Sequence, residues 1–211
     1  MAVELLVEGP RDAGPVLILA HGAGQPSRSA FMDAIAAGLA GGGVRVVRFD
    51  FPYMAAMQRS GKRRAPDREP VLLATWREVI ERVLGGGVPR GRLLIGGKSM
   101  GGRMASLIAD ESGVGGLVCL GYPFHPPGKP QRLRIDHLRG LRTPALICQG
   151  TRDPFGSREE VAGYALCAGI RLVWIKDGEH SFKPRKGSGR TLEQNLAQAV
   201  SAVLAFAASL S

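Results

Sequence analysis

The sequence has few of the residues that bind a metal or cross-link a small secreted fold. Its 211 residues include only three cysteines and four histidines. Cys119, Cys148 and Cys167 are far apart in apolar surroundings, which is typical of reduced core residues in a cytoplasmic protein. The His and Cys residues show no metal-ligand spacing. We therefore expect neither a metal site nor a cofactor.

Long apolar runs and a targeting leader are also missing. The opening MAVELLVEGPRD has no basic segment and no long hydrophobic core of the kind that marks a signal peptide. The longest apolar segment, residues 196–210, is broken by Gln198, Ser201 and Ser209. It falls short of the roughly 20 residues that a membrane span needs. We expect a cytoplasmic protein with no membrane partner.

Acidic residues are in the minority, with 18 Asp and Glu against 28 Lys and Arg and a formal net charge of +10. Such an excess can indicate nucleic-acid binding. The basic residues are spread along the chain, however, and are dense only in RSGKRR (59–64) and KPRK (183–186), with no nucleic-acid-binding signature. A solvated basic surface is favoured, and we expect no nucleic-acid partner. Arg63 and Arg64 attract an acidic substrate or simply keep their loop soluble. The sequence carries no signal for an oligomeric state.

Short apolar runs alternate with helical patterns along the chain. The runs, each bounded by Gly, Pro or Asp, cover residues 16–20, 44–49, 93–95, 117–120, 145–148 and 172–175. They suit strands that are buried on both faces of a parallel sheet. Apolar residues recur at helical spacing in 72–83 and 192–207, residues 157–160 form a capping box, and 54–69 predict a long polar loop. The pattern predicts a single α/β domain over residues 1–211, with helices on both faces of a mostly parallel sheet.

The stretch LLIGGKSMGGRMASL (93–107) has two interpretations. Its GKS could end a phosphate-binding loop, and its GKSMG is also the G-x-S-x-G of a nucleophile elbow. The phosphate loop needs a glycine at position 92, which is Arg92, so that interpretation fails. The elbow fits, because a strand precedes Ser99 and a helical segment follows it. Gly97 and Gly101 leave room for the sharp turn.

A nucleophilic serine needs a base, an orienting acid and an oxyanion hole. His180 follows the last predicted strand, and Asp153 follows the strand before it. Ser99, Asp153 and His180 therefore occur in the chain order of an α/β-hydrolase triad. Asp177 and Glu179 are nearer to His180 in sequence but share its loop, so we rank them below Asp153. Ser99 alone could equally be a helix N-cap, but the other elements at the expected strand ends favour catalysis.

The segment AHGAG follows the first long apolar run and precedes a helix, where such folds place an oxyanion donor. We expect the backbone N–H groups of Met100 and Ala23 to be the donors. Gly22 and Gly24 would let this loop approach closely. His21 would be structural, with its ring bonded to a backbone group.

Lys98, inside the elbow, is unusual because a buried ammonium needs a partner. The segment RFDFPY supplies Asp50 at the same edge of the sheet, so one hypothesis pairs Lys98 with Asp50. The alternative is an exposed lysine without a partner.

His125 and His137 lie in a long loop and could line the pocket, although an ordinary surface or packing role is favoured.

Six segments together resemble the small α/β-hydrolases of the KANL/Tex type, related to the dienelactone-hydrolase-like branch. They are AHGAG, RFDFPYM…GKRRAPD, GGKSMGGR, GYPFHPPGKP, QGTRDPFG and EHSFKPRK. The resemblance covers nearly the whole chain and implies an α/β-hydrolase fold without a large cap domain and the triad Ser99, Asp153 and His180. The family consists largely of predicted hydrolases, and its eukaryotic members resemble subunits of chromatin complexes.

The sequence therefore predicts a cofactor-free serine hydrolase that cleaves an ester or related acyl bond of a small molecule through an acyl-serine. The alternative is a non-catalytic protein-interaction domain on the same scaffold. The intact triad argues against this alternative, because nothing in the pattern is degraded.

Overall fold

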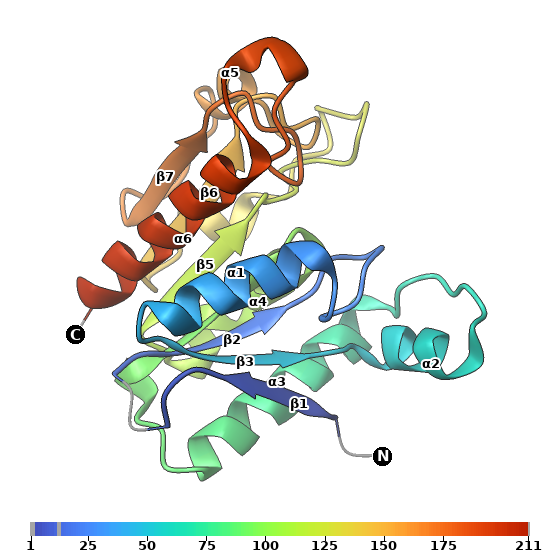
Figure 1. Cartoon of the computed structure of the whole chain (residues 1–211), viewed down its shortest axis with the longest axis vertical. Helices are drawn as coiled ribbons and strands as arrows, with labels where there is room; N and C mark the ends of the chain where they lie inside the picture. Colours follow the sequence, from blue (N-terminus) through green and yellow to red (C-terminus); the bar gives the residue numbers. More distant parts are fainter. Residues whose placement is uncertain (1–2, 12–13, 211) are drawn as a thin grey trace.

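A seven-stranded sheet runs through the middle of the computed structural model, which describes residues 3–11 and 14–210 (Figure 1). The strands lie in the order β1-β3-β2-β4-β5-β6-β7, and only β1 is antiparallel to its neighbour. Their bounds are β1 Leu5–Glu8, β2 Val16–Ala20, β3 Arg45–Phe49, β4 Leu93–Lys98, β5 Gly116–Leu120, β6 Ala145–Gly150 and β7 Ile170–Ile175.

Helices cover both faces of this sheet. On one face α1 packs against α6, and on the other α3 packs against α4 (Figure 1). The helices are α1 Ala30–Gly41, α2 Pro52–Ser60, α3 Glu69–Gly85, α4 Met100–Ser112, α5 Arg158–Val161 and α6 Leu192–Ala208. This is a mostly parallel sheet with helices on both faces, and the described residues contain no large cap domain. The predicted fold class is confirmed.

Strand β2 is apolar along its whole length because both of its faces are buried. In β2, Val16, Ile18 and Ala20 belong to the apolar cluster under α3 and α4. Leu17 and Leu19 belong to the cluster under α1 and α6. Successive side chains of a strand point to opposite faces, so a strand between two helical layers needs apolar residues at every position.

Two elements differ from the sequence prediction. Strand β1 was not predicted, because it is a short edge strand whose side chains are only partly buried. Helix α2 occupies part of the segment expected to be a polar loop. It begins with Pro52 at its first turn and ends at Gly61 in the left-handed conformation, and Tyr53 and Met54 are buried. Burial of these two side chains in the core thus helps to stabilise the helix.

Parallel strands bring their carboxyl ends to one edge of the sheet, and β4 lies at its centre. The segments that follow β2, β4, β6 and β7 therefore meet at one edge. Open α/β sheets bind ligands at such an edge. The predicted site residues lie there.

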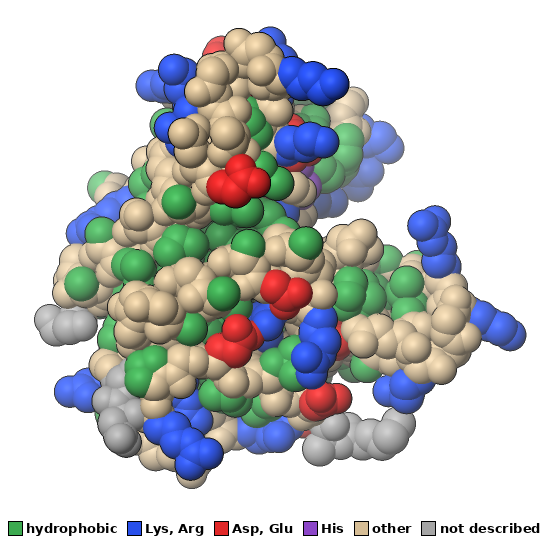
Figure 2. All heavy atoms as spheres, viewed as in Figure 1, with side chains coloured by type: hydrophobic (Ala, Val, Ile, Leu, Met, Phe, Trp, Pro, Cys, Tyr) green, Lys and Arg blue, Asp and Glu red, His purple; other side chains and the backbone are tan. Residues whose placement is uncertain are grey.

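The surface carries the excess of basic residues. Figure 2 shows Lys and Arg side chains scattered over the face in view, several of them projecting beside α2. Lys62, Arg63 and Arg64 are exposed in the loop between α2 and α3. None of the helices described here combines the length and the apolar character that crossing a bilayer requires.

Candidate active site

The turn between β4 and α4 has the backbone conformation of a strained elbow. Ser99 has φ 50° and ψ −114°, a combination that side-chain-bearing residues rarely adopt. Its N–H donates to the carbonyl of Leu120 (3.0 Å) and its carbonyl accepts from the N–H of Arg103 (3.0 Å). These two bonds hold the strained residue between the sheet and the helix.

Two glycines make this elbow sterically possible. A Cβ at Gly97 would lie 2.4 Å from the carbonyl oxygen of Ala20. A Cβ at Gly101 would lie 2.6 Å from the carbonyl oxygens of Ala20 and His21. Both distances are well inside van der Waals contact with backbone atoms that cannot easily move. The sequence GKSMG therefore fits the turn because its two glycines allow β4, α4 and the end of β2 to pack closely.

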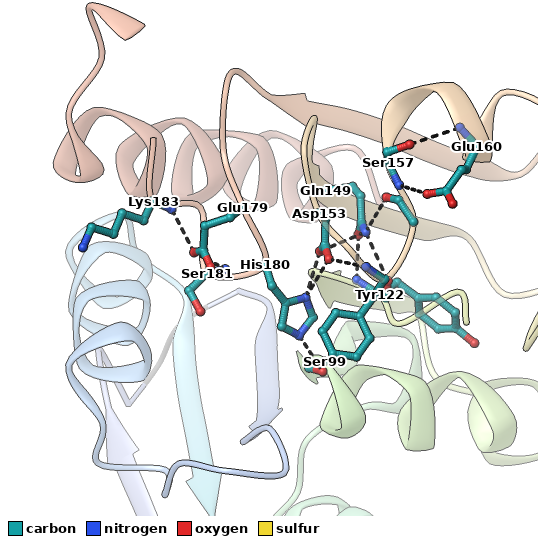
Figure 3. Close-up of polar contacts among 12 residues, drawn as sticks. Ser99, Tyr122, Gln149, Asp153, Ser157, Glu160, Glu179, His180, Ser181 and Lys183 are labelled. Atoms are coloured by element: carbon teal, nitrogen blue, oxygen red, sulfur yellow. Dashed lines mark hydrogen bonds and ion pairs between the residues drawn. The ribbon is translucent and has the colours of Figure 1, made fainter. Parts of the chain in front are cut away.

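Ser99, His180 and Asp153 form one hydrogen-bonded chain (Figure 3). His180 Nε2 lies 2.8 Å from Ser99 Oγ, and Nδ1 lies 2.8 Å from Asp153 Oδ2 and 3.1 Å from Oδ1. A carboxylate can only accept, so Nδ1 carries the proton of the neutral ring. Nε2 is then the acceptor and the hydroxyl of Ser99 donates to it, which is the arrangement in which imidazole can take the serine proton.

The carboxylate of Asp153 is fully buried and held by further donors. The N–H of Phe155 donates to Oδ1 (2.9 Å), and Gln149 Nε2 donates to Oδ2 (3.0 Å). Gln149 is itself fixed, because its Oε1 accepts from the N–H of Tyr122 (2.7 Å) and its Nε2 also contacts the carbonyls of Tyr122 and Gly156. Gln149 was not among the site residues predicted from the sequence. Its signal is a lone polar residue in the buried strand ALICQG.

The other two carboxylates near His180 are engaged elsewhere. Asp177 Oδ1 accepts from Arg185 (2.9 Å) and lies 3.0 Å from the guanidinium of Arg152. The hydrogen bonds from Arg185 hold the pKa of Asp177 below its usual value. Glu179 accepts from the N–H of Ser181 (2.7 Å) and points away from the ring (Figure 3). Of the three candidate acids, only Asp153 is bonded to His180.

His21 is fully buried and bonded to backbone on both sides. Its Nε2 accepts the N–H of Phe51 (3.0 Å), so Nδ1 carries the proton and donates to the carbonyl of Gly22 (2.6 Å). Burial lowers the pKa of His21, which favours this neutral form. The ring is thus bonded to backbone groups, as the proposed structural role requires. The hydroxyl of Tyr53 adds a second bond to the same loop, to the carbonyl of Ala23 (2.9 Å).

These bonds orient the peptide group between Gly22 and Ala23. In a trans peptide the N–H points opposite to the C=O, so a carbonyl held by His21 directs the N–H of Ala23 the other way. The N–H groups of Ala23 and Met100 donate no hydrogen bond within the described residues. A Cβ at Gly22 would lie 3.6 Å from Ser99 Cβ, which places this loop beside Ser99.

The expected steric reason for two loop glycines is wrong. Around Gly22 a Cβ would meet only ordinary contacts, the nearest at 3.5 Å, and around Gly24 it would meet nothing within 4 Å. The loop approaches Ser99 without requiring a glycine at either position.

The proposed pair between Lys98 and Asp50 is also wrong. Asp50 accepts from the N–H of Ser27 (2.8 Å) and from Gln58 Nε2 (2.7 Å). Lys98 is 8% exposed, and its ammonium is buried without a hydrogen-bond partner in the described part of the chain. The reason is the strand order. Asp50 follows β3, which β2 separates from β4, whereas Lys98 Nζ lies 3.0 Å from the Cβ position of Gly121, after β5.

A second serine–histidine contact lies away from this edge. Ser106 Oγ is 2.8 Å from His137 Nε2, but its hydroxyl also lies 2.7 Å from the carbonyl of Arg103, which can only accept. The proton of Ser106 is therefore already committed, and no carboxylate in the described residues hydrogen-bonds to His137. The remaining histidine, His125, contacts the carbonyl of Pro126 (2.9 Å). Both histidines are packing residues and neither borders the cavity at Ser99.

A cavity of about 440 Å³ opens beside Ser99 and His180. Its walls are mainly apolar, with Phe31 and Phe155 the largest side chains. Arg63 and Arg64 are not among the lining residues. The described chain also contains no group of three or more His, Cys, Asp or Glu side chains placed to hold a metal ion. The residues around the cavity are Gly22, Ala23, Gly24, Gln25, Ser29, Ala30, Phe31, Met32, Lys98, Ser99, Phe155, His180 and Ser181.

Comparison with known proteins gives the same fold. A family model described as "Alpha/beta hydrolase domain" matches residues 13–208. Est1E from Butyrivibrio proteoclasticus is similar, with TM-score 0.71, 16% identity and coverage of 99% of this chain and 94% of that one. A dienelactone hydrolase from Anabaena variabilis has TM-score 0.69, 20% identity and coverage of 98% and 89%. An α/β serine hydrolase without lid from Xanthomonas campestris has TM-score 0.66, 21% identity and coverage of 95% and 89%. At these identities the likeness shows the fold alone.

Proposed function

Because the chain belongs to the alpha/beta hydrolase domain family, whose model matches residues 13–208, we propose that it is a serine hydrolase acting on an ester or related acyl bond. The observation that carries this proposal is the hydrogen-bonded chain Ser99–His180–Asp153 at the wall of a cavity. The substrate is a small molecule whose acyl group fits that cavity. The narrower KANL/Tex-type assignment rests on the sequence motifs and is part of the proposal.

In the first half of the reaction Ser99 Oγ attacks the acyl carbonyl carbon while its proton passes to His180 Nε2. The carbonyl π electrons move to oxygen, and the N–H groups of Ala23 and Met100 are the donors proposed for this oxyanion. The C–O bond to the leaving group then breaks, and His180 returns the proton to the departing oxygen. Asp153 accepts from Nδ1–H throughout and stabilises the imidazolium.

In the second half a water molecule takes the place of the leaving group. His180 removes a proton from this water, the resulting oxygen nucleophile attacks the acyl-serine, and the Ser99 oxygen leaves with the proton from Nε2. The products are the free acid and the unchanged enzyme. Phe31 and Phe155, which border the cavity, would contact the acyl chain.

Labelling with a fluorophosphonate tests the proposal, because only an activated and accessible serine hydroxyl attacks phosphorus readily. Wild-type protein should be labelled once, at Ser99, and Ser99→Ala should not be labelled. Ser106→Ala is the matched control, since it removes the other serine that contacts a histidine. Labelling that persists in Ser99→Ala contradicts the assignment. A folded wild-type chain that neither reacts nor hydrolyses any ester would instead support the interaction-domain alternative.

A further inference from the structure

The ammonium of Lys98 is a buried charge without a partner beside the proposed nucleophile. Lys98 borders the cavity, and its Nζ has no hydrogen-bond acceptor among the described residues. The aliphatic part of Lys98 and the side chain of Ser99 both lie next to Gly22. A Cβ at Gly22 would lie 3.5 Å from Lys98 Cγ and 3.6 Å from Ser99 Cβ. The ring of Phe31 has its centroid 5.6 Å from Nζ, and Asp153 and Glu179 attract the charge without a hydrogen bond to it. One aromatic ring offsets only a small part of the cost of burying an ammonium.

A second positive feature opens on the same cavity. The N-terminal turn of α1, from Ser29 to Met32, forms part of its wall. Ser29 makes no side-chain cap, and the N–H groups of Ala30, Phe31 and Met32 donate no hydrogen bond within the described residues. Free N–H groups at the start of a twelve-residue helix attract an anion. These backbone N–H groups could therefore bind the same anion as the ammonium of Lys98.

No carboxylate borders the cavity to balance these groups. Its lining residues include no Asp or Glu. Asp33, in the first turn of α1, is paired with Arg48 (2.6 Å). Asp153 is buried against His180, and Glu179 bonds to its own loop. The cavity thus has apolar walls, one cation and one helix N-terminus, and an anionic ligand group would complete it.

We propose that this cavity binds an acyl group carrying a carboxylate, held between the ammonium of Lys98 and the N-terminus of α1, so that the chain prefers hemiesters of dicarboxylic acids. This inference rests on the proposed hydrolase function and names its substrate class. A single ammonium matches the single negative charge of a carboxylate better than the double charge of a phosphate. The apolar walls suit the methylene chain that joins the carboxylate to the ester carbonyl.

The ring of Phe31 lies over the ammonium and must turn aside when the carboxylate binds. Phe31 is only partly buried, and its side chain borders the cavity from the first turn of α1. The reaction itself is ordinary hydrolysis. The ester C–O bond breaks, water supplies the hydroxyl of the new acid and the proton of the released alcohol, and the distal carboxylate is unchanged.

The test compares matched ester pairs. Monoethyl succinate, glutarate and adipate are measured against ethyl butanoate, pentanoate and hexanoate, with ethanol release as the readout. The ratio of kcat/KM for a hemiester to that for its neutral partner should exceed ten for at least one chain length. In Lys98→Met and in Lys98→Gln this ratio should fall at least tenfold, mainly through KM. Lys62→Met removes an exposed ammonium from the α2–α3 loop and should leave the ratio unchanged.

Binding to Ser99→Ala separates this inference from the proposed function. Calorimetric titration should show that this variant binds the preferred monoethyl hemiester at least tenfold more tightly than the neutral ester, and that Lys98→Met in the same background removes the difference. If this binding difference is seen but the wild type hydrolyses no ester, the anion site is supported and the proposed hydrolase function is contradicted. If the wild type hydrolyses esters but the hemiester-to-neutral ratio of kcat/KM is the same in Lys98→Met, the hydrolase function is supported and the anion site is contradicted.

Discussion

Replacing Lys98 by methionine should stabilise the protein at neutral pH. The two side chains have similar length, and methionine fills the same space without a charge to desolvate. Burial lowers the pKa of Lys98 from its usual 10.5 to about 8, against the opposing attraction of Asp153 and Glu179. At about 1.36 kcal/mol per pKa unit, this difference corresponds to a destabilisation of about 3 kcal/mol by the charged form at pH 7.

The pH dependence of this effect has a definite sign. Between pH 8 and 10.5 the unfolded chain holds the Lys98 proton and the folded chain has released it. The free energy of unfolding therefore rises with pH in this window. The destabilisation is fully present below about pH 8 and should fall to about 1 kcal/mol near pH 9.5 to 10. Lys98→Met lacks the titrating group, so its advantage over wild type should shrink by about 2 kcal/mol.

Urea unfolding at pH 7 and pH 9.5, followed by tryptophan fluorescence, measures both quantities. Trp76 is fully buried in the cluster under α3 and α4, so its emission should report the loss of the core. Lys62→Met is the control, because its ammonium is exposed and its removal should change stability by no more than about 0.5 kcal/mol at either pH. A Lys98→Met protein less stable than wild type at pH 7 would refute the reasoning, as would an advantage independent of pH.

Four further outcomes follow from the site. Asp153→Asn should lower kcat by roughly 10⁴-fold, whereas Asp177→Asn should leave kcat within about threefold of wild type. If steady-state kinetics show that Asp177→Asn is the more damaging change, Asp153 is not the acid that orients His180. Tyr53→Phe should lower kcat by about tenfold with little change in KM, because the lost hydroxyl fixes the carbonyl of Ala23, and an unchanged kcat would contradict this role. Gly97→Ala should lower the melting temperature markedly, since its Cβ would meet a carbonyl at 2.4 Å, and an unaltered melt would exclude that clash. Ester hydrolysis should survive EDTA, because backbone N–H groups stabilise the oxyanion, and a loss that zinc or magnesium restores would show a metal requirement.

The order of strands and polar residues along the sequence was enough to predict the site residues that lie at the ends of strands. Ser99, Asp153 and His180 each follow a strand of the sheet. The carboxyl ends of parallel strands share one edge, so their meeting required no knowledge of side-chain packing. The fold class followed from the same alternation. Strand boundaries were less predictable, because β4, β6 and β7 extend past their apolar runs.

Side-chain partners could not be read in the same way. The hypothesis that paired Lys98 with Asp50 placed their two strands side by side, whereas β2 lies between β3 and β4. Gln149 was missed because a single amide in a strand has no periodicity, and its importance lies in its four contacts to Tyr122, Asp153 and Gly156. Helix α2 was missed because the polar residues from Gln58 onward dominate the segment, although its own Met-Ala-Ala-Met favours a helix. The first two of these features depend on which elements become neighbours.

The distribution of the triad along the chain determines when the serine can become reactive during folding. Ser99 and His180 are 81 residues apart. Asp153 follows β6 and His180 follows β7, the last two strands of the sheet. A ribosome-bound chain folded only as far as β5 would already contain the elbow and the loop after β2. It would contain no base, so its serine would be an ordinary alcohol. Under the proposed mechanism, docking of β7, which places His180 beside Ser99, is therefore the folding event that would make this serine a nucleophile, and a chain without β7 would not form an acyl-serine.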